Sequence, residues 1–149
     1  MRVGIDVSPL ALTRAGTARH IRSLLEVLEA EPDLELKRYA FGGSSRAVVP
    51  VRDLVWYHLA LPTKAGSDGV DVLHCPTHRA PVHSPVPLVV TFHDLAILRH
   101  PETFNRWTRT YSRRTLPRIV RAAQRIIAVS SFTKRELLEL LDVPEEKVR

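Results

Sequence analysis

The 149-residue sequence predicts an α/β fold with a mainly parallel sheet. Short apolar runs alternate with segments of helical periodicity, as in parallel sheets covered by helices. The stretch Pro87–Leu95 opens with a continuous apolar, β-branched run, which is typical of a strand buried on both faces. This run stops at His93 and Asp94, and α/β proteins bind ligands outside the carboxyl ends of their strands. The alternative is structural: Asp94 caps the next segment and His93 is a hydrogen-bonded loop histidine.

The composition predicts one soluble globular domain. The chain is 44% hydrophobic, and no apolar run approaches the eighteen or so residues that a membrane span requires. Asp6 interrupts what would be the apolar region of a signal peptide, and a lone cysteine, Cys75, cannot form an internal disulfide, so we expect a cytoplasmic protein. A net charge of +6 suits nucleic acid, anionic lipid or phosphorylated small molecules.

The N-terminal stretch predicts a strand, a glycine turn and a helix. Arg2–Ser8 is the strand, the turn passes through Arg14–Thr17, and apolar residues at helical spacing continue to a stop at Pro32. Such a turn can cradle a phosphate, because glycine permits close approach and the helix N-terminus offers free N–H groups. With the single glycine Gly16 and no P-loop lysine, a plain strand–helix turn is the alternative that these residues favour.

The following segments predict two more strands with a helix between them. Leu34–Phe41 alternates apolar and polar residues, as in a strand near the sheet edge, and Gly42–Ser45 is a loop. Val51–Leu61 predicts a helix closed by Pro62, and Lys64–Gly69 a loop. Val70–His74 predicts the next strand.

Two predicted strands end in histidine, His74 and His93. In a parallel sheet the carboxyl ends of the strands lie at one edge, so both histidines are expected at this edge, the rim. Between them, Cys75–Val86 contains three prolines and predicts an irregular loop. A zinc site is the alternative function for this region, but the spacing lacks the paired ligands of a tetrahedral site, so we expect no metal. The residues with zinc-compatible side chains are His74, Cys75, His78, His83 and His93.

A long arginine-rich helix is predicted over 103–123, with Pro117 kinking it or starting a new helix. The arginines between Arg106 and Arg125 gather on one side, and apolar residues take the other. This face is either solvated or contacts an anionic membrane or phosphorylated partner, with Trp107 and Tyr111 as interfacial anchors. Nucleic acid is disfavoured, because no recognised binding motif accompanies the charge.

The C-terminal stretch predicts a strand, a helix and the start of another strand. Arg125–Ser130 is predicted to be a buried strand, Ser131 a helix N-cap, and Lys134–Leu141 the helix. Val143–Arg149 turns toward a further strand.

Five motifs in order resemble the N-terminal half of family 4 (group 1) retaining glycosyltransferases of the GT-B type. The resemblance covers nearly the whole chain, and the closing Val143–Val148 resembles the segment before the crossing into a second domain. The motifs are Gly4-Ile5-Asp6 with Ala15–Ile21, Asp71–Pro76, Val90–Leu95, Pro101-Glu102 and Ile127–Leu137.

This resemblance implies a Rossmann-like, three-layer α/β/α acceptor domain over residues 1–149. A hexose would pass with retention from a nucleotide-diphosphate sugar to a sugar, a lipid-linked sugar or a small metabolite, without metal or other cofactor. The donor site, with a basic residue and a pair of glutamates, would belong to a C-terminal domain absent from this chain, so the isolated chain should be inactive. Residues carried over are His93 and Asp94 (catalytic), Gly16 and Thr17 (donor diphosphate), and His74, Thr77, His78 and Ser130 (acceptor).

A stand-alone flavodoxin-like module that binds an anionic partner through its arginine face is the alternative to an enzyme. Ala18, where many relatives carry a second glycine, departs from the family pattern at the diphosphate loop. The expected location is cytoplasmic, with peripheral contact at the inner membrane face through Arg106–Arg125.

Overall fold

A computed structural model describes residues 1–12, 16–42 and 48–149. The expected turn residues Arg14 and Ala15 and the expected loop residues Gly43–Ser45 lie outside this range. Five parallel strands form one sheet in the order β2-β1-β3-β4-β5, which confirms the predicted α/β class. The strands are β1 (Arg2–Asp6), β2 (Glu35–Tyr39), β3 (Val72–Cys75), β4 (Leu88–Phe92) and β5 (Arg125–Ala128).

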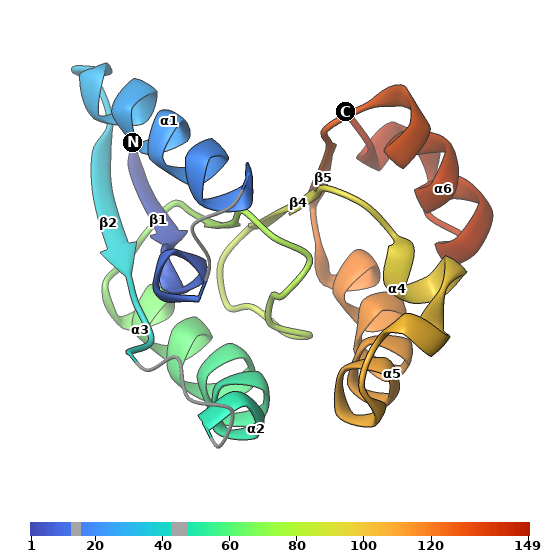
Figure 1. Ribbon diagram of the computed structural model, residues 1–149. Coiled ribbons are helices and arrows are strands. Elements are labelled where there is room, and N and C mark those ends of the chain that lie inside the picture. Colours follow the sequence, from blue (N-terminus) through green and yellow to red (C-terminus); the bar gives the residue numbers. More distant parts are fainter. Residues whose placement is uncertain (13–15, 43–47) are drawn as a thin grey trace.

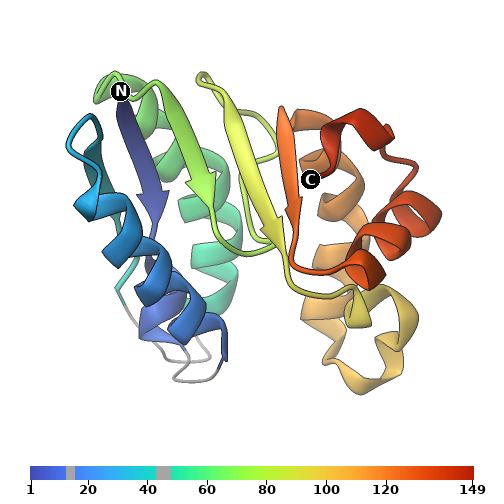
Figure 2. The ribbon, with the colours of Figure 1, turned by 90° about the horizontal axis from the view of Figure 1, so that it is seen from above.

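Helices cover both faces of the sheet, giving the three-layer arrangement (Figures 1 and 2). One face carries the first and last long helices, and the other carries the green helices and the orange helix α5. The helices are α1 (Gly16–Ala30), α2 (Val49–Val51), α3 (Leu61–Ser67), α4 (Ala96–Arg99), α5 (Arg106–Ala122) and α6 (Ser131–Leu141). Shorter or irregular turns are η1 (Ser8–Ala11), η3 (Arg52–Ala60), η4 (Pro101–Thr103) and η5 (Glu145–Lys147).

The strand order places a switch point between β1 and β3. The chain leaves β1 toward β2 on one side, whereas later strands add on the other, so the connections diverge at the carboxyl ends of β1 and β3. Gly4 allows this part of the sheet to pack closely, because a Cβ there would lie 2.7 Å from Cε2 of Tyr39. The carboxyl edge between these strands is therefore where a ligand crevice is expected.

The segment from α2 to α3 differs from its prediction. Instead of a helix ending at Pro62 and a loop over Lys64–Gly69, helical turns run without a break from Val49 to Ser67. The central part, η3, is a π-helix, whose wider turn changes which side chains face the core, and Leu59 is 63% exposed. Pro62 is tolerated because it lies in the first turn of α3.

The C-terminal half also corrects several boundaries. Helix α5 begins at Arg106, capped by Asn105, and runs through Pro117 as one helix. Ser130, not Ser131, caps α6: its Oγ accepts the N–H of Thr133 at 3.1 Å. Strand β5 is only partly buried, because it lies near the sheet edge. The expected further strand begins where Val148 forms a parallel bridge with Ile126.

The loop between β3 and β4 has no helix, as its prolines predicted. It runs on the face that carries α3 and α5, where Val82 and Val86 pack against the main core. No helix among the described residues is long and apolar enough to cross a membrane.

Candidate active site

His93 lies at the carboxyl end of β4, half-buried. Its Nε2 lies 3.0 Å from the carbonyl oxygen of Pro76, at the end of the neighbouring strand. A carbonyl oxygen can only accept, so Nε2 carries the proton and donates. In the neutral ring, Nδ1 then keeps a lone pair for a ligand. This hydrogen bond fixes the orientation of the ring.

His20, from the second turn of α1, packs edge-on against His93. The two ring centroids are 5.0 Å apart and the rings are nearly perpendicular, at 84°. Burial lowers the pKa of His20, and the nearby His93 lowers it further. Sequence reasoning did not select His20. The sequence position of His20 could have indicated its place in the site. It lies four residues after Gly16, about one helical turn along α1, and α1 begins at the same edge of the sheet as the rim.

His74, on β3, is buried and lies near enough to His20 for the two rings to affect each other's charge. Its Nε2 shares a 2.9 Å hydrogen bond with the hydroxyl of Thr91 on β4. Burial lowers the pKa of His74 to about 4, with a smaller contribution from His20. The structure therefore brings His74 and His93 to one rim, as the parallel sheet predicted, and adds His20.

The low pKa of His74 predicts a loss of stability in mild acid. Its folded-state pKa, about 4, lies below the ordinary 6.5, so below pH 6.5 the unfolded state binds the proton more readily. We expect the free energy of unfolding to fall by roughly 1 kcal/mol per pH unit from this group between pH 6.5 and 4. Urea titrations of His74→Gln should show a shallower slope, while exposed His100→Gln should match the parent. Equal slopes for all three proteins would contradict the prediction.

Thr77 and His78 follow β3 on the loop side of the rim. The Thr77 Oγ1 accepts the N–H of Arg79 at 3.4 Å, which makes it part of the loop's own turn. The pKa of His78 is lowered to about 4, first by burial and then by the positive charge of Arg79. The ring of His78 is tilted against that of Phe92, with centroids 6.4 Å apart.

Asp94 and Ser130 both have structural partners. The Asp94 Oδ1 accepts the N–H of Ala96 at 3.0 Å, which is the capping role considered as the alternative, and its side chain remains exposed. The Ser130 hydroxyl caps α6 by accepting the N–H of Thr133, and the hydroxyl of Thr133 donates to the backbone carbonyl of His93. Thr133 therefore links Ser130 to the backbone at His93.

Gly16 and Thr17 form the first turn of α1. Gly16 is exposed, and a Cβ added there would meet nothing within 4 Å, so packing does not require glycine at this position. As the start of a fifteen-residue helix, this turn presents backbone N–H groups and the positive end of the helix dipole. An anion could bind there without any basic side chain.

Asp6 anchors the carboxyl end of β1 and the turn after it. Its carboxylate accepts hydrogen bonds from the hydroxyls of Ser8, at 2.5 Å, and Tyr57, at 3.0 Å. Ser8 in turn accepts the N–H of Phe41 at 2.8 Å. Burial raises the pKa of Asp6, against these hydrogen bonds that lower it. The network joins the carboxyl end of β1 to the segment after β2 and to η3.

A buried charged cluster, which the sequence did not reveal, joins η3, α5 and the β3–β4 loop. At its centre Asp53 is fully buried. Its Oδ1 pairs with Arg52, at 3.1 Å, and with Arg79, and its Oδ2 accepts the indole N–H of Trp107 at 3.0 Å. The adjacent charges of Arg52 and Asp53 inside an apolar stretch could have indicated a buried ion pair.

Tyr111 belongs to the same cluster and is not a membrane anchor, contrary to the sequence-based suggestion. Only 7% of it is exposed, and its hydroxyl donates to the backbone carbonyl of Asp53 at 2.9 Å. Trp107 is more exposed, at 37%, but its indole N–H is bound to Asp53. Both aromatic residues therefore fasten α5 to η3.

The family model described as Glycosyltransferase Family 4 matches residues 12–149, which contain all three histidines of the rim. The chain belongs to this glycosyltransferase family. No curated protein matches it. Two features at the carboxyl edge of the sheet can bind the substrates of a glycosyltransferase. The ring nitrogens of the rim histidines can hydrogen-bond hydroxyl groups, and the backbone amides at the N-terminus of α1 can bind an anion.

The described residues contain no group of three or more histidine, cysteine or acidic side chains arranged to hold a metal ion. Two of the three rim histidines have hydrogen-bond partners in the protein: His74 bonds to Thr91 and His93 to Pro76. Cys75 is fully buried, and burial raises the pKa of its thiol, which disfavours the thiolate form needed for ligation or nucleophilic attack.

Proposed function

We propose that this chain is the acceptor-side domain of a retaining glycosyltransferase that uses a nucleotide-diphosphate hexose. The observation that carries the proposal is the rim formed by His20, His74 and His93 at the carboxyl edge, in a chain of glycosyltransferase family 4. Strand order alone would also suit a flavodoxin-like binding module, because both are doubly wound. The family match supports the enzyme and gives no support to that alternative.

In the proposed reaction, an acceptor hydroxyl oxygen replaces the diphosphate at the anomeric carbon, on the same face of the sugar. The bond from that carbon to the diphosphate oxygen breaks, and the acceptor proton passes to the departing diphosphate. His93 would hydrogen-bond a sugar hydroxyl through Nδ1, because Nε2 is engaged by Pro76. The amides of Gly16 and Thr17 would stabilise the negative charge that develops on the leaving group.

The acceptor would lie on the loop side of the rim, near His74, Thr77 and His78, with Ser130 and Asp94 at its border. Low pKa values keep His74 and His78 neutral at physiological pH, and neutral rings can both donate and accept hydrogen bonds. That chemistry suits hydroxyl groups better than it suits an anion. A sugar, a lipid-linked sugar or a small polyol-like metabolite fits this requirement.

The test is to read the coding sequence past Arg149 and to assay the complete product. We expect a second α/β domain with a basic residue and two glutamates eight positions apart, and a product that keeps the anomeric configuration by NMR. The separate chain 1–149 should fold and transfer no sugar. A stop codon directly after Arg149, or transfer by the chain alone, would overturn the two-domain proposal.

We also propose a cytoplasmic protein that makes peripheral contact with anionic membranes through Arg106–Arg125. The supporting observation is that the arginines of α5 are exposed along its outer side. Co-sedimentation should increase with the anionic lipid content of vesicles and decrease with salt. Equal sedimentation with neutral and anionic vesicles would count against membrane contact.

A further inference from the structure

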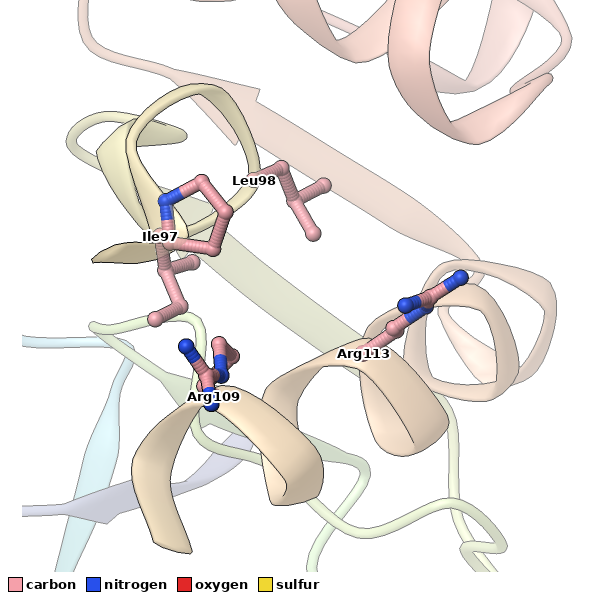
Figure 3. Close-up of a pocket in the computed structure, with 5 residues that line it drawn as sticks. Ile97, Leu98, Arg109 and Arg113 are labelled. Atoms are coloured by element: carbon pink, nitrogen blue, oxygen red, sulfur yellow. The ribbon is translucent and has the colours of Figure 1, made fainter. Parts of the chain in front are cut away.

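A groove lies between α5 and the segment made of α4 and η4, and none of the rim histidines lines it (Figure 3). It encloses about 490 Å³, within the range of small-molecule sites. Ile97, Leu98 and Pro101 form one wall, and Arg109 and Arg113 of α5 form the other. Figure 3 shows Arg109 extending from α5 toward Ile97 of α4, whereas Arg113, one turn further along α5, extends away from Ile97.

The apolar wall is held in place by contacts outside the groove. Arg99, on α4, donates to Glu136 and Glu139 of α6, at 2.6 Å each. Ile97 is largely buried, and Leu98 packs against the main core. The charge of Arg99 is therefore neutralised on the α6 side, and α4 presents an apolar surface to the groove.

The opposite wall has a concentrated positive charge. Arg109 and Arg113 are four residues apart, so they lie on the same side of α5, where like charges repel. Within the described residues, neither guanidinium has an ion pair or hydrogen bond with an acidic side chain. Both side chains are exposed and available to an external anion.

We propose that this groove binds one lipid phosphate, that is, a phosphate monoester carrying an alkyl chain. The phosphate would lie beside Arg109, and the exposed side chain of Arg113 would turn toward it, because guanidinium groups bind phosphate oxygens in pairs and two of them suit a dianion. The alkyl chain would lie against Ile97, Leu98 and Pro101. This site goes beyond sugar transfer and requires only the groove, so its test does not depend on the proposed reaction.

The test uses the 149-residue chain and octyl phosphate below its micelle concentration, followed by NMR or calorimetry. We expect saturable binding at least tenfold tighter than that of inorganic phosphate or of octanol, since neither has both features. Arg109→Gln with Arg113→Gln should weaken it at least tenfold. The matched control is Arg114→Gln with Arg118→Gln, which removes the same charge at the same spacing and should change binding less than twofold.

Two further measurements separate binding of the alkyl chain from binding of the phosphate and from unfolding. Leu98→Ser should weaken octyl phosphate but leave inorganic phosphate unchanged, and thermal melts should show that each variant is folded. Equal losses in both arginine pairs, or no loss in the groove pair, would overturn the proposal. Binding seen only with anionic vesicles, and not with octyl phosphate, would also overturn it and would indicate general surface attraction.

Discussion

Asp53→Asn is expected to lower the free energy of unfolding by about 3–5 kcal/mol, because it removes the only negative charge in a buried cluster of described residues. Asp53 is fully buried and pairs with Arg52, itself only 5% exposed, and with Arg79. Asparagine keeps the shape and one hydrogen-bond acceptor but leaves two guanidinium groups without a countercharge. Urea or guanidinium titration of the purified chain measures the change.

Two controls separate the charge from other effects of this substitution. Glu26→Gln removes an exposed carboxylate from α1 and is expected to change stability by less than about 0.5 kcal/mol. Adding Arg79→Gln to Asp53→Asn should cost less than the sum of the two single changes, because the second change removes one of the unpaired charges. Simple additivity in this double-mutant cycle would refute charge pairing as the cause.

His93→Ala is expected to lower kcat of the complete enzyme by about a hundredfold or more, as losses of a well-placed hydrogen-bonding group in transition states commonly do. The structure engages Nε2 with the carbonyl of Pro76, and the proposal assigns Nδ1 to the substrate. Alanine removes both. Steady-state kinetics on the proposed two-domain enzyme provide the measurement, with His100→Ala as an exposed-histidine control expected to stay within twofold.

Two amide variants can assign the effect to one nitrogen. His93→Asn keeps a polar atom near the position of Nδ1, whereas His93→Gln keeps one near Nε2. If Nδ1 acts on the substrate, His93→Asn should retain more activity and His93→Gln more thermal stability. The reverse ranking, with activity following the contact to Pro76, would show that His93 only shapes the loop.

The sequence predicted those features of the site that follow from local residue patterns and from the direction of the strands. The prediction was that strands ending in His74 and His93 meet at one edge of a parallel sheet. The sheet is parallel, β3 ends one residue later, at Cys75, and His93 bonds to the carbonyl of Pro76 directly after it. The resemblance also predicted the family, which the match over residues 12–149 confirms. The roles of His93 and Asp94, of Gly16 and Thr17, and of the acceptor residues stay predictions.

What the sequence by itself determined is the α/β class, the parallel sheet, the irregular β3–β4 loop and the common rim of His74 and His93. These follow from apolar periodicity and proline positions, which act within one element. Tertiary structure alone decided the pairing of Asp53 with Arg79, the burial of Tyr111 and the contact of His20 with His93. Each of these joins segments distant in sequence, and such contacts depend on how helices pack over the sheet, which local patterns do not encode.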